Sequence, residues 1–299
     1  YEYTVKETKG SIGGIDYDTT EYTVVINVSD NGAGQLVATK GIKVGKETKT
    51  AISFTNPYSS KGSLTLGAKK TLSGKTLAAG DFSFELKSSN GDVLQTKTNA
   101  ANGTVTFDKI NYTQADLSKS PITYTISEVI PSDAVNAAGT KYADASNEEK
   151  AAGGFKKGGI TYDSHVETIT VTLSDDGKGT ITATPDKNGA AVAFGNSYSS
   201  SGSTTLGAEK TITGRQFKEG DSFTFTVTPK NDAPAFSKPS VTVEPKSGSS
   251  VSVDFGSATY TAGGTYEYTV KETKGSIGGI DYDETEYTVT VSVVDNGDG

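Results

Sequence analysis

The chain has 299 residues without Cys, Met or Trp, and its 36 acidic and 28 basic side chains give a net charge of −8 at pH 7. This charge argues against nucleic acid as a partner, because no basic stripe is available to neutralise phosphates. No apolar run approaches the roughly 18 residues of a membrane span, no signal peptide is present, and no disulfide can form without Cys.

The composition predicts strands and turns. Thr, Val, Tyr and Ser are abundant, 35 residues are Gly, and long helical periodicity is absent. Only 33% of the residues are hydrophobic, but they are concentrated in alternating runs, as half-buried antiparallel strands require. We therefore expect an all-β chain of two or three domains, built as tandem Ig-like β-sandwiches in a rod-like array.

Internal repeats organise the chain. Residues 1–34 return as residues 266–299 with six differences, an offset of 265 positions. A more diverged repeat relates residues 64–86 to residues 204–227, an offset of 140 positions. The repeats and the absence of an initiator Met indicate a mature or excised window on a longer tandem array.

Two Ser/Gly segments, SSKG at 59–62 and SSSG at 199–202, are predicted interdomain linkers. They divide the chain into three parts. We expect the C-terminal part of one Ig-like domain at 1–58, a complete domain at 63–198, and the N-terminal part of a third domain at 203–299. The third domain would be a near-copy of the first.

Turn signals recur within these domains. Five Asp/Asn-Gly sequences fit tight primed hairpin turns: Asp30-Asn31-Gly32, Asn90-Gly91, Asn102-Gly103, Asp175-Asp176-Gly177 and Asp295-Asn296-Gly297. Residues 133–157 alone have a helix-permissive composition, which predicts an insertion loop with room for a short helix.

Three strands each place one polar residue on an otherwise apolar face. In the run 64–72 the even-numbered residues are apolar except Lys70, so a strand of period two directs this amine to the core. The same alternation puts Glu128 and Asn196 on apolar faces. The pattern recurs at Lys210, Glu272 and Asn56. The outward neighbour of the lysine reverses its charge between the copies, from Lys69 to Glu209, whereas the inward lysine is retained. Burying an unpaired charge costs several kcal/mol, so these residues need partners.

The three residue types can react with one another. Desolvation disfavours the ammonium of a buried lysine, and the neutral amine is a nucleophile. A buried glutamate can stay protonated, hydrogen-bond an amide carbonyl and move protons. An asparagine carboxamide in contact with both is an electrophile with ammonia as its leaving group. Intramolecular placement can supply effective molarities of about 10⁵ to 10⁸ M, and the product is a Lys-Asn isopeptide bond.

These residues lie in recognisable motifs. The run K-T-L-x-G-x-x-L-x-x-G-x-F-x-F-x-L of 70–86, the Y-x-I-x-E of 124–128 and the F-x-N-x-Y of 194–198 resemble the pilin isopeptide linkage domain of Gram-positive surface proteins, including the streptococcal backbone pilin. The resemblance covers essentially the whole chain. It implies a bond between Lys70 and Asn196 with Glu128 as catalyst.

The resemblance also implies two further, partial sites. Lys210 and Glu272 would belong to one site, with its asparagine beyond Gly299. Glu7 and Asn56 would belong to the other, with its lysine before Tyr1. The family usually also shows an LPxTG-type sorting signal and a Y-P-K-N-like context for a polymerising lysine, and this sequence contains neither, so the resemblance gives no support for sortase-built polymerisation through this segment.

Less specific readings are open for each feature. Lys70 could extend past a strand end, and Glu128 could form an ordinary buried salt bridge with it, but the recurrence of all three positions favours the isopeptide. The sequence DNGD at 295–298 resembles a calcium loop. Ala33 and Lys178 occupy equivalent positions in the other copies, which favours a solvated turn. No metal or cofactor is therefore predicted.

Three functions are considered. The first is a structural stalk or pilus-like repeat on a bacterial cell surface, extracellular and anchored to the cell wall or part of a fibre, with neighbouring repeats as partners and possible head-to-tail self-association. The second is an adhesin that binds a host protein or glycan, with the loop 133–157 as a candidate surface. The third, a hydrolase, is weak because no acid pair, metal cluster or nucleophile triad stands out. We expect no enzyme activity beyond a single-turnover, intramolecular bond formation.

Overall fold

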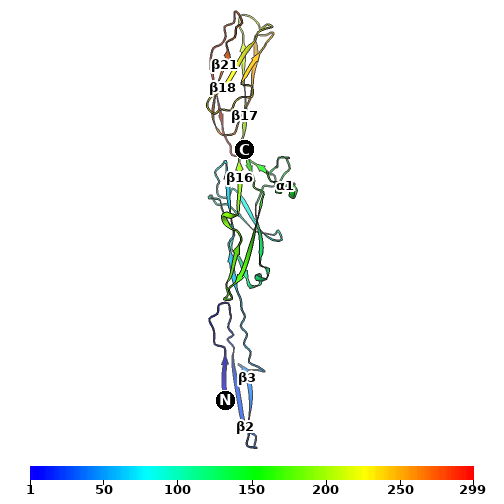
Figure 1. Cartoon of the computed structure of the whole chain (residues 1–299), viewed down its shortest axis with the longest axis vertical. Coiled ribbons are helices and arrows are strands. Elements are labelled where there is room, and N and C mark those ends of the chain that lie inside the picture. The colour runs from blue at the N-terminus through cyan, green and yellow to red at the C-terminus, as the bar shows by residue number, and fades with distance from the viewer. The chain divides into compact units, whose positions relative to one another are not determined.

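The computed structural model describes all 299 residues, and most of its regular structure is β-strand (Figure 1). By its contacts the chain divides into two compact units. The first comprises Tyr1–Thr71, Leu77–Val129 and His165–Phe194, and the second comprises Leu72–Thr76, Ile130–Ser164 and Gly195–Gly299. The predicted all-β class is confirmed.

The first unit begins with an antiparallel sheet in the order β1-β2-β3-β4. Its strands are Glu2–Lys6 (β1), Glu21–Asp30 (β2), Leu36–Val44 (β3) and Glu47–Lys49 (β4). The buried Tyr22 of β2 packs edge-on against Phe54, with 5.3 Å between ring centroids, and its hydroxyl donates to Ser53 O at 2.7 Å. These contacts hold the segment that follows β4 against the sheet.

A five-stranded sheet of the first unit has the order β15-β14-β11-β7-β8 and is antiparallel throughout. Its strands are Ser83–Ser88 (β7), Val93–Thr98 (β8), Ile122–Glu128 (β11), Val166–Asp175 (β14) and Ile181–Pro185 (β15). Along β11 every second residue is buried, namely Tyr124, Ile126 and Glu128. The period of two that the sequence shows is therefore the period of burial.

A second five-stranded sheet has the order β12-β13-β16-β6-β9. Its strands are Gly67–Ser73 (β6), Thr104–Thr106 (β9), Lys156–Lys157 (β12), Ile160–Thr161 (β13) and Ala193–Tyr198 (β16). Strands β6 and β16 both begin in the first unit and end in the second. Phe84 of β7 and Phe194 of β16 lie 5.3 Å apart between ring centroids, so the two sheets pack face to face as a β-sandwich.

Shorter elements complete this part of the chain. Strand β5 (Lys61–Leu64) pairs with β10 (Ile110–Thr113), which leads into the 3₁₀ helix η1 (Gln114–Lys119). A second 3₁₀ helix, η2 (Gly189–Ala191), precedes β16. The only α-helix, α1 (Asn147–Ala152), lies inside the predicted insertion loop 133–157, and Ser146 caps its first turn by accepting from Glu149 N.

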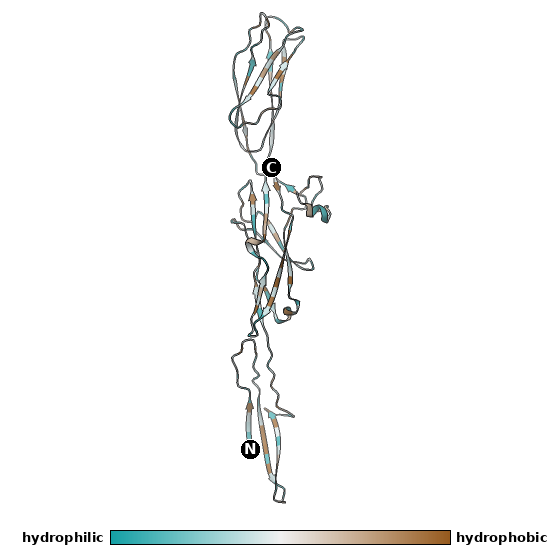
Figure 2. Ribbon diagram, viewed as in Figure 1, coloured by the Kyte–Doolittle hydropathy of each residue, from teal (hydrophilic) through white to brown (hydrophobic).

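The second unit also contains two sheets. Gly202–Thr211 (β17) pairs with Ser250–Tyr260 (β20), and the other sheet has the order β19-β18-β21-β22. The strands of the latter are Phe223–Pro229 (β18), Ser240–Val243 (β19), Gly264–Thr273 (β21) and Tyr287–Val293 (β22). Figure 2 shows apolar and polar residues interleaved along these strands. The apolar ones form a core rich in aromatic rings, including Phe223, Phe255, Tyr260 and Tyr268.

The predicted tight turns are longer than expected at two positions. Strand β2 ends its pairing with β3 at Asp30 opposite Leu36, and β14 ends its pairing with β15 at Asp175 opposite Ile181. Each loop thus spans five residues. The reason is local, because the aspartate side chain accepts the N–H two residues ahead, from Gly32 at 2.9 Å and from Gly177 at 2.8 Å.

None of the helices has both the length and the apolar character needed to span a membrane.

Candidate functional site

Lys70 and Glu128 form a fully buried ion pair. The Lys70 Nζ lies 2.5 Å from Glu128 Oε2, and both side chains have an exposed fraction of 0%. Lys70 comes from β6 and Glu128 from β11, so the pair links the two facing sheets. Removing two charges from water costs free energy, and their mutual attraction offsets this cost only with close geometry and further hydrogen bonds. A contribution to stability alone therefore does not explain the pair.

Aromatic rings surround the lysine. Its Nζ lies 4.5 Å from the ring centroid of Phe82 and 5.9 Å from that of Phe84. The backbone of β6 is fixed as well, because Lys70 N donates to Gly103 O at 2.7 Å. Gly103 has a φ of +80°, and a Cβ on it would lie 2.0 Å from Lys70 O, so the turn 102–103 needs glycine to approach β6 this closely.

Asn196 is buried on β16, with 4% of the residue exposed. Its Oδ1 accepts the backbone N–H of Asp163 at 2.8 Å, and the Asp163 carboxylate accepts Gly195 N at 2.8 Å. The carboxamide is thereby held by the loop that precedes β14, and the carboxylate of Asp163 ties that loop to β16. Asp163 was not expected from the sequence reasoning.

Strands β16 and β6 are neighbours in one sheet. Lys69 N donates to Val192 O at 2.8 Å, and Thr71 Oγ1 donates to Phe194 O at 3.4 Å. Burial alternates along both strands, and Lys70 and Asn196 each belong to the buried set of their strand. The lysine and the asparagine are therefore each on the buried face of their own strand.

A second ion pair joins Lys210 of β17 to Glu272 of β21. The Nζ and Oε2 atoms are 2.8 Å apart, and the side chains are 10% and 3% exposed. The ammonium again lies over an aromatic ring, 4.9 Å from the centroid of Phe223. Glu272 Oε2 also accepts Asp283 N at 3.1 Å, whereas Glu272 Oε1 is buried without a hydrogen-bond partner.

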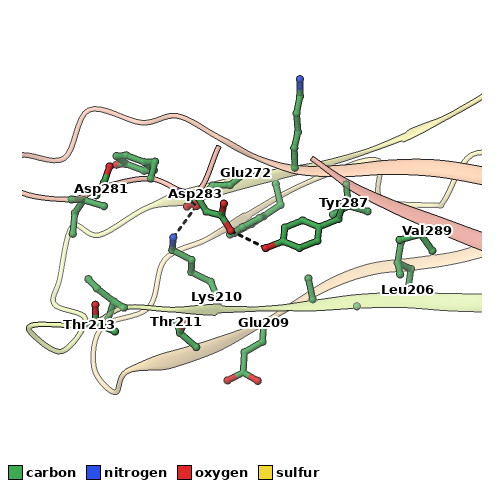
Figure 3. A pocket seen from close by; sticks show the side chains of 18 of the residues that line it. Leu206, Glu209, Lys210, Thr211, Thr213, Glu272, Asp281, Asp283, Tyr287 and Val289 are labelled. Atoms are coloured by element: carbon green, nitrogen blue, oxygen red, sulfur yellow. Dashed lines mark hydrogen bonds and ion pairs between the residues drawn. The ribbon is translucent and has the colours of Figure 1, made fainter. Parts of the chain in front are cut away.

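This second pair lines an open cavity of about 870 Å³. Figure 3 shows Lys210 and Glu272 pointing toward each other across it, with the Tyr287 hydroxyl bonded to Asp283 beside them. The other lining residues come from β17 and the two residues after it, from β18, β21 and β22, and from the loop 279–283. Here β17 belongs to a two-stranded sheet, whereas β6 belongs to a five-stranded one.

A glutamate and an asparagine meet at the third position. Asn56 Nδ2 donates to Glu7 Oε1 at 2.6 Å, and Asn56 Oδ1 accepts Asp18 N at 2.8 Å. Glu7 Oε2 is buried without a hydrogen-bond partner. The structure thus brings Glu7 to Asn56 and Lys210 to Glu272.

In each of the three clusters, the backbone N–H of an aspartate donates a hydrogen bond to the asparagine or the glutamate. Asp18 and Asp163 donate to an asparagine Oδ1, and Asp283 donates to Glu272 Oε2. Each follows a tyrosine in an I-x-Y-D sequence, at 15–18, 160–163 and 280–283. This recurrence is the signal by which the sequence could have revealed the donor. In the two clusters that contain an asparagine, this N–H is directed at the oxygen of the carboxamide.

No group of three or more His, Cys, Asp or Glu side chains in the structure could hold a metal ion. The groups that meet in these clusters are an amine, a carboxyl group, a carboxamide and a backbone N–H.

Comparison with known proteins finds one family along almost the whole chain. The profile of the FctA family, described as a Spy0128-like isopeptide containing domain, matches residues 1–59, 66–199 and 206–299. A search of curated proteins finds no match.

Several solved structures are similar to the chain. The Bacillus anthracis TIE protein is 15% identical, with a TM-score of 0.26, and the alignment covers 96% of this chain but only 42% of that one. The T-13 major pilin of Streptococcus pyogenes is 16% identical over 79% of this chain and 94% of its own, with a TM-score of 0.23. Another Streptococcus pyogenes major pilin structure is 15% identical over 71% and 82%, with a TM-score of 0.24.

Proposed function

The chain belongs to the family of Spy0128-like isopeptide-containing domains, and on this premise we propose that it is a structural stalk or pilus-like segment stapled by a Lys70–Asn196 isopeptide bond. The observation that carries the proposal is the Lys70–Glu128 pair, which is fully buried next to the strand of Asn196. A buried charged pair contributes little net stability, so a chemical role explains its presence better than packing does.

The bond forms in three steps. A proton passes from the Lys70 ammonium to the Glu128 carboxylate over their 2.5 Å contact, which removes both buried charges. The neutral Nζ then attacks Asn196 Cγ, and the negative charge that develops on Oδ1 is stabilised by the N–H of Asp163.

In the last step Glu128 relays the proton that Nζ loses to Nδ2 of Asn196, and the Cγ–Nδ2 bond breaks. The amine and the carboxamide become a secondary amide and ammonia. Glu128 ends as a neutral acid that can donate a hydrogen bond to the new amide. One turnover completes the chemistry, and no catalyst is regenerated for a second substrate.

We assign the other two clusters to partial sites of the same kind. Lys210 with Glu272 supplies an amine and an acid, and Asn56 with Glu7 supplies a carboxamide and an acid. The buried, unpartnered oxygens Glu272 Oε1 and Glu7 Oε2 fit sites that each miss one reacting group. We expect no bond between Lys210 and Asn56 of one chain. The division into domains at 1–58, 63–198 and 203–299 belongs to the same proposal.

Such a segment suits a bacterial cell surface. A crosslink between two β-strands resists reductant, protease and pulling force, which are the conditions that an extracellular fibre meets. We propose this location and neighbouring repeats as the partners. Direct ligand binding by the loop 133–157 has no specific support, because that loop packs a small core of its own around Phe155.

Intact mass spectrometry of the purified chain tests the proposal. We expect a mass one ammonia below that of the sequence, and a crosslinked peptide pair that contains Lys70 and Asn196 after digestion. Glu128→Ala should restore the full mass although neither bonded residue is changed. Glu272→Ala is the matched control, because it removes the equivalent acid of the open pair and should leave the crosslink intact. An unmodified mass for the unchanged chain would falsify the bond.

A further inference from the structure

Two loops of this chain hold a tyrosine and a serine in the same way. In the first unit, the loop Asp175–Gly179 receives the end of the preceding repeat. The Tyr58 hydroxyl donates to Asp175 Oδ1 at 2.6 Å, and the Ser60 hydroxyl donates to Asp175 Oδ2 at 2.7 Å. Gly179 N completes the arrangement by donating to the Tyr58 oxygen at 3.0 Å. Both oxygens of one carboxylate are thus used by two hydroxyls that are two residues apart.

The second unit repeats these contacts at the other linker. The Tyr198 hydroxyl donates to Asp295 Oδ1 at 2.5 Å, the Ser200 hydroxyl to Asp295 Oδ2 at 3.0 Å, and Gly299 N to the Tyr198 oxygen at 3.3 Å. The loop sequences differ, DDGKG against DNGDG, but both follow the pattern Asp-x-Gly-x-Gly. The same three hydrogen bonds form at both linkers although the loop sequences differ, which indicates a specific interaction.

The backbone around each tyrosine is shaped for the loop. Ser59 N donates to Gly14 O at 2.8 Å, and Ser199 N donates to Gly159 O at 3.0 Å, so each Tyr-x-Ser segment is tied to a Gly-Gly-Ile turn. A Cβ on Gly14 would lie 2.7 Å from Gly179 Cα, and one on Gly159 would lie 2.8 Å from Gly299 Cα. Glycines on both sides therefore let the two backbones touch.

The loop itself is preformed. Asp175 Oδ1 accepts Gly177 N and Asp295 Oδ1 accepts Gly297 N, both at 2.8 Å. The loop Asp30–Gly34 closes in the same way, with Asp30 Oδ1 accepting Gly32 N at 2.9 Å. In the two loops that contact a tyrosine, the hydrogen bond from its hydroxyl is the main cause that lowers the pKa of the aspartate. The charged carboxylate is thus the form that these contacts favour.

We infer that the Asp-x-Gly-x-Gly loop of each repeat is a socket that binds the Tyr-x-Ser segment at the end of the repeat before it. The ligand is a peptide segment with two hydroxyls spaced two residues apart, recognised by both oxygens of one carboxylate. The Ser/Gly composition of residues 59–62 is that of a flexible linker. The socket instead holds it, and Ser60 has only 5% of its surface exposed. This inference is independent of the isopeptide bond.

Trypsin cleavage after Lys61 in the full chain tests the socket, because Lys61 follows the held serine and its N–H donates to Gly179 O at 3.2 Å. Tyr58→Phe keeps the ring and removes only the hydroxyl. We expect cleavage after Lys61 to become about tenfold faster, which is the effect of losing one hydrogen bond to a charged group. Tyr198→Phe is the matched control, since it makes the same change at the other linker and should leave this rate unchanged.

A double-mutant cycle makes the test specific to the contact. Asp175→Ala alone should also speed the cleavage, and the double variant with Tyr58→Phe should be no faster than the quicker single variant, because both remove the bond between Tyr58 and Asp175. Circular dichroism and the isopeptide mass should be unchanged in all variants, which shows that the domain is folded. Equal rates for Tyr58→Phe and the unchanged chain, or fully additive effects in the cycle, overturn the inference.

Discussion

The Lys70–Glu128 pair and the Lys210–Glu272 pair are built from the same residue types on equivalent strands. In both, a lysine Nζ lies over a phenylalanine ring and within 3 Å of a glutamate oxygen, at 2.5 Å and 2.8 Å. The first pair has no exposed surface, but the second lines a cavity of about 870 Å³. The difference lies in what stands beside the lysine strand, because β6 has β16 as a neighbour and β17 belongs to a two-stranded sheet.

This comparison separates the ion pair from its surroundings. A glutamate and a lysine meet without the asparagine strand, so the pairing itself needs only the two sheets that carry them. The aspartate N–H also has different acceptors, since it donates to Asn196 in one site and to Glu272 in the other. The proposed reaction needs full desolvation of the amine and the acid, which only the first pair has.

The largest contrast is expected for the two lysines. Lys70→Ala should remove the proposed crosslink between positions 126 residues apart in the sequence, and loop-closure estimates for that length approach about 5 kcal/mol of unfolding free energy. Lys210→Ala should have a smaller effect, because we expect no crosslink at Lys210, although its side chain is only 10% exposed. Denaturant unfolding measures both.

Single-molecule pulling gives a second readout of the same contrast. The segment between the two linkers should extend little in the unchanged chain and unfold to its full length in Lys70→Ala, while Lys210→Ala extends like the unchanged chain. Equal extension for the two lysine variants would mean that the closed pair carries no covalent bond.

The aspartate N–H donors allow a sharper comparison. Asp163→Ala removes the carboxylate that accepts Gly195 N and so loosens the loop that orients Asn196. We expect bond formation after refolding to slow by about tenfold to a hundredfold, because small errors in placement lower effective molarity steeply. The same change at Asp283 should not alter the crosslink. Time-resolved intact mass after refolding measures the rate, and an unchanged rate for Asp163→Ala removes this residue from the positioning of Asn196.

A pair of glycines tests how tightly the lysine strand is seated. Gly103 and Gly91 both have positive φ, +80° and +88°, but only at Gly103 would a Cβ meet the Lys70 carbonyl. Gly103→Ala should therefore lower the unfolding free energy by about 1 to 3 kcal/mol, and Gly91→Ala by less, since it carries the conformational cost alone. Thermal unfolding gives both values. Equal losses would mean that the close approach to Lys70 contributes nothing.

The smallest expected effect concerns acid. Arg215 donates to both oxygens of Asp221 at 2.7 and 2.9 Å, and this contact lowers the pKa of Asp221 to about 2. A carboxylate whose pKa is lowered by folding stabilises the fold at pH values above its pKa in the unfolded chain, about 3.9. This contribution is lost as the pH falls through the folded pKa of about 2. An NMR titration of the Asp221 carboxyl carbon should have its midpoint near pH 2.

Arg215→Ala should move the Asp221 midpoint up toward 3.8, the ordinary value for aspartate. A midpoint that stays near 2 would assign the shift to the backbone N–H of Lys218, which also donates to Asp221. The equivalent stretch of the other domain carries Lys75 instead, whose Nζ donates to Gly297 O at 3.0 Å. The two lysine strands are therefore followed by loops that are secured in different ways.

The sequence by itself determined the all-β class, the repeats and the inward direction of Lys70, Glu128 and Asn196. These follow from local physics, since side chains alternate along a strand with a period of two whatever the strand packs against. The short helix α1 lies within the loop 133–157 for a similar reason, because Ser146 and Glu149 cap it from within the segment.

Only the tertiary structure decided which strands stand side by side and what closes each site. Lys70 and Glu128 are 58 residues apart, and Tyr58 and Asp175 are 117 apart, so no local pattern specifies either contact. The Asp163 donor is a backbone group, so the residue type alone does not mark it, and only the recurrence of the I-x-Y-D sequence could have pointed to it. The five-residue loops at Asp30 and Asp175 escaped prediction because the aspartate side chain competes with the strand ladder for backbone N–H groups. Periodicity sets the direction of a side chain, whereas its partners depend on chain segments that meet only when the sheets pack.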